Sequence, residues 1–562
     1  MSSNRLSGAE AVVRMLEAQG VTHVFGLCGD TSLPLYDALY RLGGGITHVL
    51  TRDERSAAYM ADVYARVSGR VGVCEGPSGG GATYMVPGVA EANESSSPVL
   101  AITTDIATGA RGRSALTEID QESLFRPACK WNRLLSRASQ IPVALRTAFS
   151  QMTTGRPGAA HIGLPFDVQN DAVEEDAVWT DPALERCPSR RMGPDPEMVA
   201  AAAQALRGAE RPVLVCGGGV VISGAEEQLR AVAEGLGAPV ATSVSGQGAI
   251  SDTHPLSLGV VGSNGGTPAT RAVLETADLI VFVGCRTGSV TTERWRVPAP
   301  RRVRVVHVDI DPAIIGISYP TDVAVVGDAR LCLAALNDAL GAQGTSGDGP
   351  DTVRRAREEK FAAFRELAQA DAVPIRPERI IAELQRVLPR DAVVIADPGT
   401  PCPYVSAYYE FEETGRHFVS NRAHGALGYG LPGVVGAYYA RPAAKSVAIM
   451  GDGGFGFAAG ELETIVRLDL PVTLIVLTNS NYGWIKAGQK SGYGARYYSV
   501  DFSTTHHAAV AQAYGLKAWH AREPGALRAA LTAAIEAGGP ALVDIATQPL
   551  HEARAPVSEW IA

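Results

Sequence analysis

The sequence predicts an α/β protein made of three doubly wound parallel-sheet domains. Short apolar runs typical of buried strands alternate with stretches of helical spacing. Two stretches rich in polar residues, residues 174–198 and 340–352, interrupt this alternation. With 562 residues, 46% of them hydrophobic and 19% charged, the chain can build several sizeable cores. We therefore expect domains over residues 1–175, 195–340 and 353–562.

The middle domain is expected to be Rossmann-like. A strand followed by a glycine turn starts after residue 211 (PVLVCGGG), and further strands are predicted over residues 279–283 and 303–308. The glycines at 217–219 allow two interpretations, a nucleotide-binding turn or a tight strand-to-helix turn with a structural role. They do not supply the GxGxxG fingerprint that a nicotinamide dehydrogenase would need.

The third domain contains a predicted metal and diphosphate site. The apolar run 446–450 ends at Gly451-Asp452-Gly453-Gly454, and the next strand, 472–477, ends at Thr478-Asn479. A helix-like stretch over 459–468 joins them, so a right-handed crossover would place Asp452 and Asn479 at the same carboxyl edge of a parallel sheet. A carboxylate oxygen, an amide oxygen and a main-chain carbonyl, that of Asn481, suit Mg²⁺. A lone GDG would more often be a plain turn.

Two motifs far apart in the chain resemble one family. The GDG followed by Asn about one strand–helix–strand unit later resembles the thiamine diphosphate signature of the acetolactate synthase, pyruvate decarboxylase and benzoylformate decarboxylase superfamily. Residues 49–69 (VLTRDERSAAYMADVYARVSG) resemble its amino-terminal domain, with Glu54 at the position of a glutamate that binds the cofactor's pyrimidine N1′. The resemblance implies that Glu54 helps to remove the cofactor's C2 proton. Taken alone, Glu54 fits a solvated first helical turn.

Other segments extend the resemblance over nearly the whole chain, in the order pyrimidine-binding, middle and diphosphate-binding domain. Residues 76–83 (GPSGGGAT) are similar to a glycine-rich turn beside the cofactor. In ADPGT, Gly399 and Thr400 could donate to the diphosphate. HGALGYGLP resembles a segment in which Leu427 would wedge the cofactor into a bent shape and the Gly425 carbonyl would accept its amino group. Gly453 and Gly454 are expected to let the backbone approach the cofactor.

The substrate region departs from the pattern of acetolactate synthases. Leu116 and Thr117 replace a Phe-Gln pair, Gly488 stands where those enzymes tend to have Trp, and Cys28 replaces a proline. The histidine often found before the catalytic glutamate is Asp53. These departures argue against housekeeping branched-chain biosynthesis. The candidate pocket residues are Cys28, Leu116, Thr117, His424, Tyr482, Trp484, Gly488 and Gln489, with His424 as the best placed proton donor.

The resemblance implies a carbon–carbon bond lyase or carboligase that depends on thiamine diphosphate and Mg²⁺ and acts on a 2-oxo acid or related donor. One alternative is an enzyme of the 2-hydroxyacyl-coenzyme A lyase or oxalyl-coenzyme A decarboxylase type. Another is a non-catalytic regulatory homologue, which the retention of Glu54, Asp452 and Asn479 disfavours. In this superfamily the middle domain holds FAD, ADP or coenzyme A, or nothing. Family members place the glutamate and the metal on opposite subunits, which implies a homodimer or homotetramer with active sites at the dimer interface.

Composition disfavours several kinds of partner. The net charge of −9 is dispersed along the chain, which disfavours nucleic-acid binding. The expected partner, as the resemblance implies, is a small-molecule substrate. We find no run of signal-peptide type at the amino terminus and none long enough to span a membrane. The eight cysteines have no metal-binding spacing and are expected to be reduced, which favours a cytoplasmic location.

Overall fold

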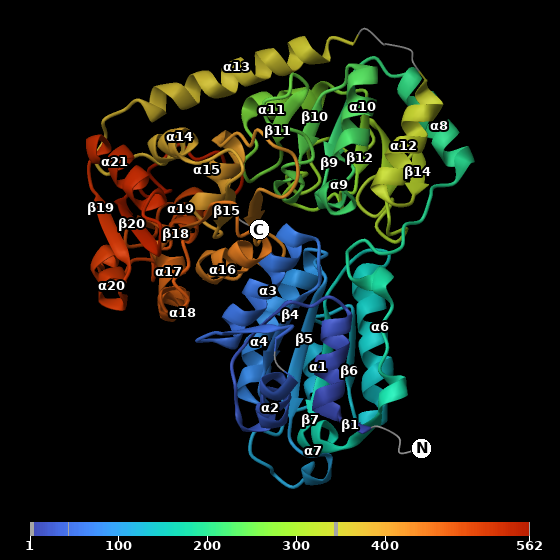
Figure 1. The fold of residues 1–562 in the computed structure, drawn as a ribbon. Helices are drawn as coiled ribbons and strands as arrows, with labels where there is room; N and C mark the ends of the chain where they lie inside the picture. The colour runs from blue at the N-terminus through green and yellow to red at the C-terminus, as the bar shows by residue number, and fades with distance from the viewer. Residues whose placement is uncertain (1–4, 43, 342–346, 561–562) are drawn as a thin grey trace. The chain divides into compact units, whose positions relative to one another are not determined.

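The computed structural model describes residues 5–42, 44–341 and 347–560 (Figure 1). The chain forms two compact units. Unit 1 contains the described residues of Met1–Arg190 together with Asn421–Ala443 and Ala458–Leu470, and unit 2 contains the remaining described residues. Two segments from the carboxyl-terminal third of the sequence thus belong to unit 1.

Three parallel sheets of six strands each confirm the predicted fold class. The first consists of β2 (His23–Gly26), β3 (Thr47–Leu50), β4 (Gly72–Gly76), β5 (Val99–Asp105), β6 (Trp131–Leu134) and β7 (Ala160–Pro165). The second consists of β9 (Pro212–Cys216), β10 (Val240–Thr242), β11 (Ser257–Val260), β12 (Leu279–Val283), β13 (Arg304–Asp309) and β14 (Val323–Val326). The third consists of β15 (Val393–Ala396), β16 (Phe418–Ser420), β17 (Ser446–Gly451), β18 (Thr473–Thr478), β19 (Lys517–Ala521) and β20 (Ala541–Ala546). β1 (Arg5–Ser7) and β8 (Ala172–Glu174) form a separate antiparallel pair.

The strand orders reveal two topologies. The first sheet has the order β3-β2-β4-β5-β7-β6 and the third has β16-β15-β17-β18-β20-β19, which is the same order counted within each sheet. The middle sheet, β11-β10-β9-β12-β13-β14, has the 3-2-1-4-5-6 order of dinucleotide-binding folds. In each sheet the strands that follow the first one are added on one side of it, and the later strands are then added on its other side. The switch point lies next to the first strand. Because ligands of open α/β sheets bind at such a switch point, each sheet has one preferred edge for a site.

Helices cover both faces of the first sheet. On one face α1 (Gly8–Ala18), α2 (Leu33–Leu42), α6 (Ile141–Thr153) and α7 (Phe166–Asn170) share a hydrophobic core with the strands. On the other face lie α3 (Glu54–Ser68) and α4 (Gly80–Glu94), and the short α5 (Gln121–Phe125) packs near β6. α3 lies very close to β4, since a Cβ on Gly72 would be 2.1 Å from the Ala61 carbonyl oxygen. α16 (Gly430–Ala440) packs along α3, and α18 (Leu462–Arg467) also belongs to unit 1 (Figure 1).

The middle and third sheets belong to unit 2. The middle sheet has one core with α8 (Pro196–Arg207), α9 (Gly218–Ser223), α10 (Glu226–Leu236) and α12 (Ala329–Leu340), and another with α11 (Pro268–Thr276). The third sheet packs on α14 (Pro377–Val387), α15 (Pro401–Tyr408) and α21 (Pro524–Ile535), and the long α13 (Gly349–Ala368) contacts α11 and α14. The remaining helices are α17 (Asp452–Ala458), α19 (Gly483–Gly492) and α20 (His507–Tyr514).

Two local predictions differ from the structure. The glycine-rich segment after β17 begins a helix that the sequence did not predict, since α17 starts at Asp452, and the predicted helix over 459–468 is a 3₁₀ turn at 459–461 followed by α18. The stretch 340–352, predicted as a flexible connection, contains the last residue of α12 and the first turn of α13, and its residues 342–346 lie outside the described residues. Pro350 opens α13 without cost because a first-turn N–H has no helical acceptor.

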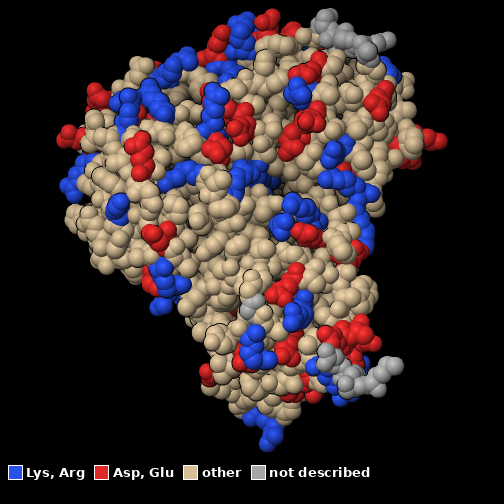
Figure 2. Space-filling view, viewed as in Figure 1, with Lys and Arg blue, Asp and Glu red and all other residues tan. Residues whose placement is uncertain are grey.

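The described surface carries mixed charge. Over the face drawn in Figure 2, Lys and Arg side chains are interspersed with Asp and Glu side chains. Among the described helices none is both long and apolar enough to cross a membrane.

Candidate functional site

The carboxylate of Asp452 organises a loop at the edge of the third sheet. β17 and β18 are parallel neighbours, so Asp452 after β17 meets the residues that follow β18, as the crossover argument predicts. Its Oδ2 accepts the backbone N–H groups of Asn479 (2.8 Å) and Ser480 (2.6 Å), and its Oδ1 accepts that of Gly453 (2.9 Å). Burial raises the pKa of Asp452, although these three donors favour the ionised form.

Two amide oxygens in the loop after β18 are buried without a hydrogen-bond donor in the described part of the chain. They are the Oδ1 atoms of Asn479 and Asn481. The Asn481 amide nitrogen donates to the Asn479 carbonyl oxygen (2.8 Å), which leaves the Asn481 oxygen available. Buried polar atoms are rarely left without a partner, so unpaired amide oxygens next to a carboxylate fit a hard cation such as Mg²⁺. No described cluster of three His, Cys, Asp or Glu side chains could hold a metal, which makes these amides the relevant ligands to consider.

The switch point of the third sheet lies between β15 and β17, next to this loop. Gly399 in the turn after β15 has a φ of 102°, and a Cβ placed on it or on Gly451 would have no neighbour within 4 Å. Thr400 is nearly buried where α15 begins. Gly454 has a packing role, since its Cβ would lie 2.1 Å from the Asp397 carboxylate. Open space at two turns on one switch-point edge is where a diphosphate would fit.

Three residues outside the predicted metal and cofactor ligands support the start of the metal loop. The Thr478 hydroxyl donates to Asp544 (2.6 Å) and lies 3.0 Å from His507 Nδ1. His507 is buried and its ring lies edge-on to Phe455. These contacts hold the end of β18 next to α17. The signal in the sequence was an acid, Asp544, inside the apolar strand β20.

Glu54 begins α3 in unit 1 and is 5% exposed. Burial raises the pKa of its carboxyl group, and the charges of Asp53 and Glu75 add to this effect. The glycine-rich turn before α4 leaves room for the side chain. A Cβ on Gly81 would lie 2.9 Å from Glu54 Oε1, and one on Gly76 would lie 3.1 Å from its Cγ. A carboxyl group with a raised pKa, facing a turn without side chains, is suited to share a proton with a ligand.

Glu75 is a second buried carboxyl group at this edge, and sequence reasoning missed it. It lies on β4 opposite Gly26 of β2, at the switch point of the first sheet. The Tyr36 hydroxyl donates to Glu75 Oε1 (2.5 Å), and His48 Nε2 lies 3.1 Å from the same oxygen. A Cβ on Gly26 would lie 2.1 Å from Glu75 Oε1, so only glycine at position 26 leaves space for this carboxyl group. The available signal was an acid at the end of the apolar run VGVCE.

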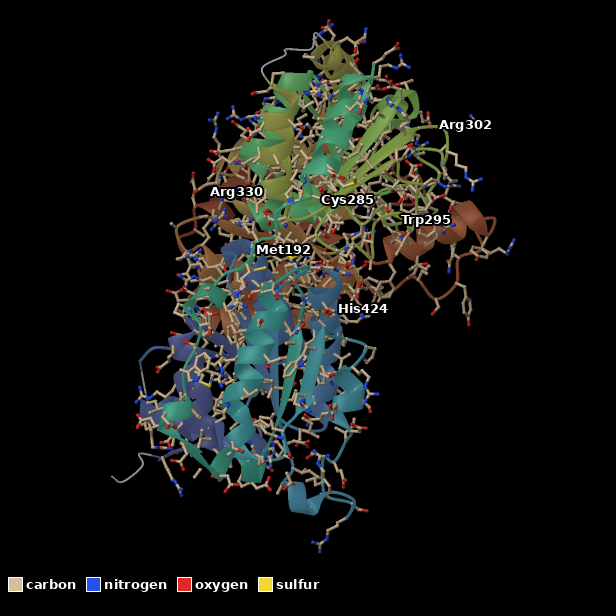
Figure 3. The ribbon with its side chains drawn as sticks, turned by 90° about the vertical axis from the view of Figure 1, so that its right-hand side faces the viewer. Met192, Cys285, Trp295, Arg302, Arg330 and His424 are labelled. Carbon is tan, nitrogen blue, oxygen red and sulfur yellow. The ribbon has the colours of Figure 1, made fainter. Side chains whose placement is uncertain are left out.

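The segment predicted to hold the wedge, residues 423–429, also lies in unit 1. Gly425 has a φ of 75°, and Leu427 is half-buried. The His424 side chain is exposed (Figure 3), while its backbone N–H donates to Glu91 (2.6 Å). The side chain is therefore available to a ligand, and the backbone is held from α4.

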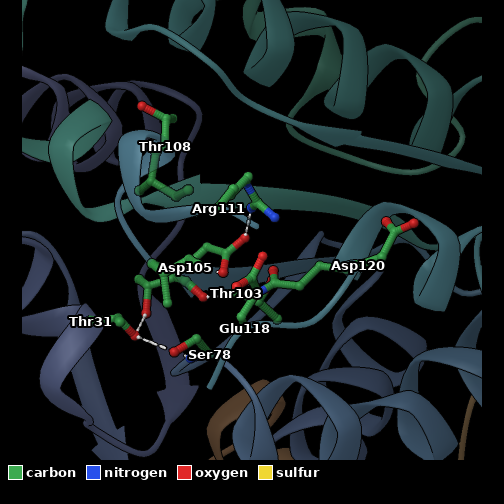
Figure 4. Close-up of polar contacts among 12 residues, drawn as sticks. Thr31, Ser78, Thr103, Asp105, Thr108, Arg111, Glu118 and Asp120 are labelled. Carbon is green, nitrogen blue, oxygen red and sulfur yellow. Dashed lines mark hydrogen bonds and ion pairs between the residues drawn. The ribbon is translucent and has the colours of Figure 1, made fainter. Parts of the chain in front are cut away.

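The predicted pocket residues of unit 1 lie around the glycine-rich turn. Thr117 has a left-handed φ of 67° and its hydroxyl lies 2.6 Å from that of Ser78. A chain of hydroxyl groups continues from Ser78 to Thr31 and Thr104 (Figure 4). Leu116 is 85% exposed, and the thiol-bearing Cys28 is also exposed. The structure thus brings Thr117 to the turn and leaves the Leu116 side chain in solvent.

A partly buried ion pair borders this hydroxyl chain. Asp105 ends β5 and pairs with Arg111, while the Glu118 carboxylate accepts the backbone N–H of Gly112 at 2.6 Å (Figure 4). Burial raises the pKa of Asp105 although Arg111 opposes the shift. These contacts link distant positions of residues 105–118, in which the only regular element after β5 is the 3₁₀ turn Thr108–Ala110.

The predicted pocket residues of unit 2 follow the metal loop. The Tyr482 ring lies edge-on to Phe502, and the Trp484 ring lies edge-on to Trp560 of the carboxyl-terminal tail. A Cβ on Gly488 would lie 3.5 Å from the Trp560 carbonyl oxygen, so the tail covers this position. Both amide atoms of Gln489 bind the backbone of Tyr498, which makes its observed role structural.

The glycine turn of the middle sheet has a packing role. A Cβ on Gly217 would lie 2.1 Å from the Gly284 carbonyl oxygen, and one on Gly219 would lie 2.7 Å from the Gly284 Cα. These glycines are therefore required by the close approach of two backbone turns at the switch point between β9 and β12. Cys285, after β12, and Met192, whose carbonyl accepts the Asp328 N–H at 2.9 Å, border the same edge of the sheet (Figure 3).

The three doubly wound sheets, the oxygen-rich loop and the buried glutamate define a thiamine diphosphate-dependent enzyme, and comparison with known domains agrees. Residues 6–124 match the thiamine pyrophosphate enzyme N-terminal TPP binding domain, residues 199–336 its central domain, and residues 397–545 its C-terminal TPP binding domain. The chain belongs to the thiamine pyrophosphate enzyme family.

Relatives similar over nearly the full length bear the name acetolactate synthase. A probable acetolactate synthase large subunit of Methanocaldococcus jannaschii is 37% identical over 554 residues, which cover 97% of this chain and 92% of the relative. That of Methanococcus aeolicus is 36% identical over 559 residues with the same coverage. The acetolactate synthase isozyme 3 large subunit of Escherichia coli is 34% identical over 536 residues, covering 94% of this chain and 92% of the relative.

Proposed function

We propose that this protein is a Mg²⁺- and thiamine diphosphate-dependent carboligase or lyase whose donor substrate is a 2-oxo acid. The observation that carries the proposal is the set of oxygens at the switch point of the third sheet: the Asp452 carboxylate and the unpaired amide oxygens of Asn479 and Asn481. Thiamine diphosphate, when bound, supplies a carbon nucleophile for the donor's carbonyl carbon and a ring that accepts the electrons released on C–C cleavage.

In this proposal Asp452, Asn479 and Asn481 would hold Mg²⁺ and, through the metal, the diphosphate. Asn481 can contribute its main-chain carbonyl or its unpaired side-chain oxygen. Gly453 and Gly454 keep the backbone small beside the metal, while Gly399 and Thr400 donate hydrogen bonds to the diphosphate from the neighbouring turn. These few protein oxygens would suffice for Mg²⁺, because this ion generally retains water ligands in proteins.

Glu54 is proposed as the residue that exchanges a proton with the cofactor's pyrimidine ring. Its raised pKa supports this role, because a carboxyl group that titrates closer to neutrality gives and accepts a proton more readily at physiological pH. Gly425 would accept a hydrogen bond from the pyrimidine amino group, and Leu427 would press against the cofactor to keep it bent. His424, with an exposed imidazole, is the proposed proton donor to the product.

We further propose that the enzyme is similar to acetolactate synthases without being the housekeeping one. This part of the proposal concerns the acceptor substrate. The support lies in the pocket candidates: the exposed Leu116, the hydroxyl of Thr117 and the Gly488 covered by the tail. Cys28, Tyr482, Trp484 and Gln489 remain further candidates for the pocket wall. Whether the bound donor ends as an aldehyde or is joined to an acceptor depends on this wall.

Two alternatives make different predictions. A 2-hydroxyacyl-coenzyme A lyase or oxalyl-coenzyme A decarboxylase would hold ADP or coenzyme A in the middle domain, whereas an acetolactate synthase-like enzyme could hold FAD there. The 3-2-1-4-5-6 strand order supports a nucleotide at the middle sheet's switch point. A non-catalytic regulatory homologue would show no turnover. We also propose a homodimer or homotetramer with active sites at the dimer interface, and a cytoplasmic location in keeping with eight free cysteines.

Calorimetric titration with thiamine diphosphate, before and after removal of Mg²⁺ by a chelator, tests the site. We expect binding only with Mg²⁺, and we expect Asp452→Ala to weaken it by about 100-fold or more. The matched control is Asp391→Ala, an exposed acid of the same region. Binding that is indifferent to Mg²⁺ and to Asp452 would contradict the assignment.

Turnover tests the chemistry. A panel of 2-oxo acids and 2-hydroxyacyl-coenzyme A esters is screened for release of CO₂ or aldehyde, and Glu54→Gln is expected to reduce turnover by about 100-fold or more. A 2-oxo acid substrate supports the proposal, and an acyl-coenzyme A substrate selects the alternative. A variant that turns over as fast as the wild type would show that Glu54 does not exchange the proton. A yellow flavin absorbance, or ADP released on denaturation, would identify the ligand of the middle domain.

A further inference from the structure

Residues 423–429 depend on side chains from α3 and α4 for their shape. The segment contains no helix or strand, so other parts of the chain must fix the shape of its backbone. Three consecutive N–H groups point at one carboxylate. Glu91 Oε2 accepts from His424 (2.6 Å) and Gly425 (3.3 Å), and Glu91 Oε1 accepts from Ala423 (3.4 Å).

The other end of the segment is held by a second acid. The Tyr429 hydroxyl donates to Asp62 Oδ2 at 2.6 Å, and the Tyr429 ring lies edge-on to Tyr59. Asp62 lies on α3, two turns after Glu54. The segment between the two anchors is short and contains Gly425 and Leu427.

Arg66 joins the two anchors. Its guanidinium binds both carboxylate oxygens of Asp62 (2.9 and 2.8 Å) and Glu91 Oε1 (3.0 Å). The Ser95 hydroxyl donates to Glu91 at 2.7 Å, which gives this carboxylate five donors. Both acids are fully buried. Buried polar groups need such hydrogen bonds, and in this network the donors of Arg66, Ser95, Tyr429 and the backbone N–H groups of residues 423–425 supply them.

We infer that Glu91 is a positioning residue: with Asp62 and Arg66 it clamps residues 423–429 and thereby sets Gly425 and Leu427 in place before the cofactor binds. The inference rests on the proposed function for the roles of Gly425 and Leu427. The clamp itself rests only on the contacts above. It reduces the ordering that cofactor binding would otherwise require, because the binding-competent form of the segment is already populated.

Glutamine at position 91 would break the clamp while keeping its shape. A carboxylate accepts on both oxygens, but an amide has one acceptor and one donor. In Glu91→Gln, the amide nitrogen would face either the N–H groups of His424 and Gly425 or the guanidinium of Arg66. Donor would meet donor in both orientations, so the segment should detach from α4.

Amide hydrogen exchange of the protein without cofactor provides the first readout. In Glu91→Gln we expect residues 423–427 to exchange about 10-fold faster or more, with unchanged exchange in β5 and β7 of the same unit. Tyr429→Phe, which removes only the bond to Asp62, should loosen the same residues to a smaller extent. Glu94→Gln, on the same helix at an exposed position, is the matched control and should leave the exchange as in the wild type. Unchanged exchange in Glu91→Gln, or faster exchange throughout unit 1, would overturn the inference.

Cofactor titration provides the second readout. In Glu91→Gln the dissociation constant for thiamine diphosphate should rise about 10-fold, since only a fraction of the molecules would hold the segment correctly, while kcat at saturating cofactor should stay within about threefold. Glu91→Asp, which keeps both oxygens, should recover part of the affinity. Local loosening with unchanged cofactor affinity would refute the positioning role. If the wild-type protein bound no thiamine diphosphate, the proposed function would be wrong. The clamp would then be tested by the amide hydrogen exchange measurement alone.

Discussion

Glu54, Glu75 and Glu91 are buried in unit 1 and differ in the partners of their carboxyl groups. Glu91 has five donors, among them a guanidinium. Glu75 has Tyr36 and His48 on one oxygen, while its other oxygen has no partner in the described structure. Glu54 has a raised pKa because burial disfavours its charge. A carboxyl group with complete hydrogen bonding serves structure, whereas one whose pKa is raised by burial is suited to proton exchange.

Glu75→Gln should lower the pKa of Glu54, because the negative charge of Glu75 is one of the causes that raise it. The limb of the pH–rate profile that reports Glu54 should therefore move to lower pH. Measurement of kcat/KM against pH in both proteins checks the shift. Glu54→Gln is the internal control, since that limb should be absent from its profile. A limb that stays in place or moves to higher pH would show that the two carboxyl groups do not interact.

At the scale of elements, the turn between β4 and α4 shows how glycines create a site. Gly80 and Gly81 are adjacent, yet a Cβ on Gly80 would have no neighbour within 4 Å, whereas one on Gly81 would lie 2.5 Å from Pro77 and 2.9 Å from Glu54 Oε1. Two helix starts converge here, because Glu54 opens α3 and Gly80 opens α4. The glycine run in the sequence does not distinguish these two positions.

Gly81→Ala should push the Glu54 carboxyl group out of position and reduce turnover about 10-fold or more, because an added methyl cannot fit at 2.5 Å from proline. Gly80→Ala is the matched variant and should reduce turnover much less. Initial rates at saturating cofactor, together with melting temperatures of both variants, test the comparison. Equal losses in the two variants would show that the turn, and not the contact with Glu54, limits activity.

Helix boundaries illustrate where sequence patterns are insufficient. The strands 446–451 and 473–478 lie within one residue of their predicted positions, since continuous apolar runs are typical of buried parallel strands. α17 was not predicted, because glycines at its second, third and fifth positions disfavour a helix. Phe455, which is buried against His507, stabilises the helix through a contact that no local pattern contains.

At the scale of the whole molecule, the first and third sheets have the same strand order, and each carries one part of the proposed site at its switch-point edge. Glu54 and Glu75 lie at the edge of the first sheet, and Asp452 lies at that of the third. An enzyme that needs both edges must bring two such domains together. The proposal that they come from different subunits can be tested directly.

Mixing two inactive variants should restore activity if the site forms between subunits. Glu54→Gln and Asp452→Ala each disable one half, so a mixed dimer contains one intact site and one doubly altered site. After unfolding and refolding an equal mixture, we expect roughly a quarter of the wild-type activity, because random pairing makes half of the dimers mixed. Each variant refolded alone is the control. A mixture that stays inactive, in dimers shown to exchange subunits, would place the complete site within one chain.

The sequence by itself determined the alternation of strands and helices, the family, and the meeting of Asp452 with the loop that carries Asn479. These follow from local patterns and from the fixed handedness of a strand–helix–strand crossover. Only the tertiary structure decided that Glu91 binds the backbone of His424, 333 residues away, and that Glu75 shares an edge with Glu54. The physical reason is that burial and long-range hydrogen bonds depend on how distant segments pack. That packing gives a buried acid its partners and its role.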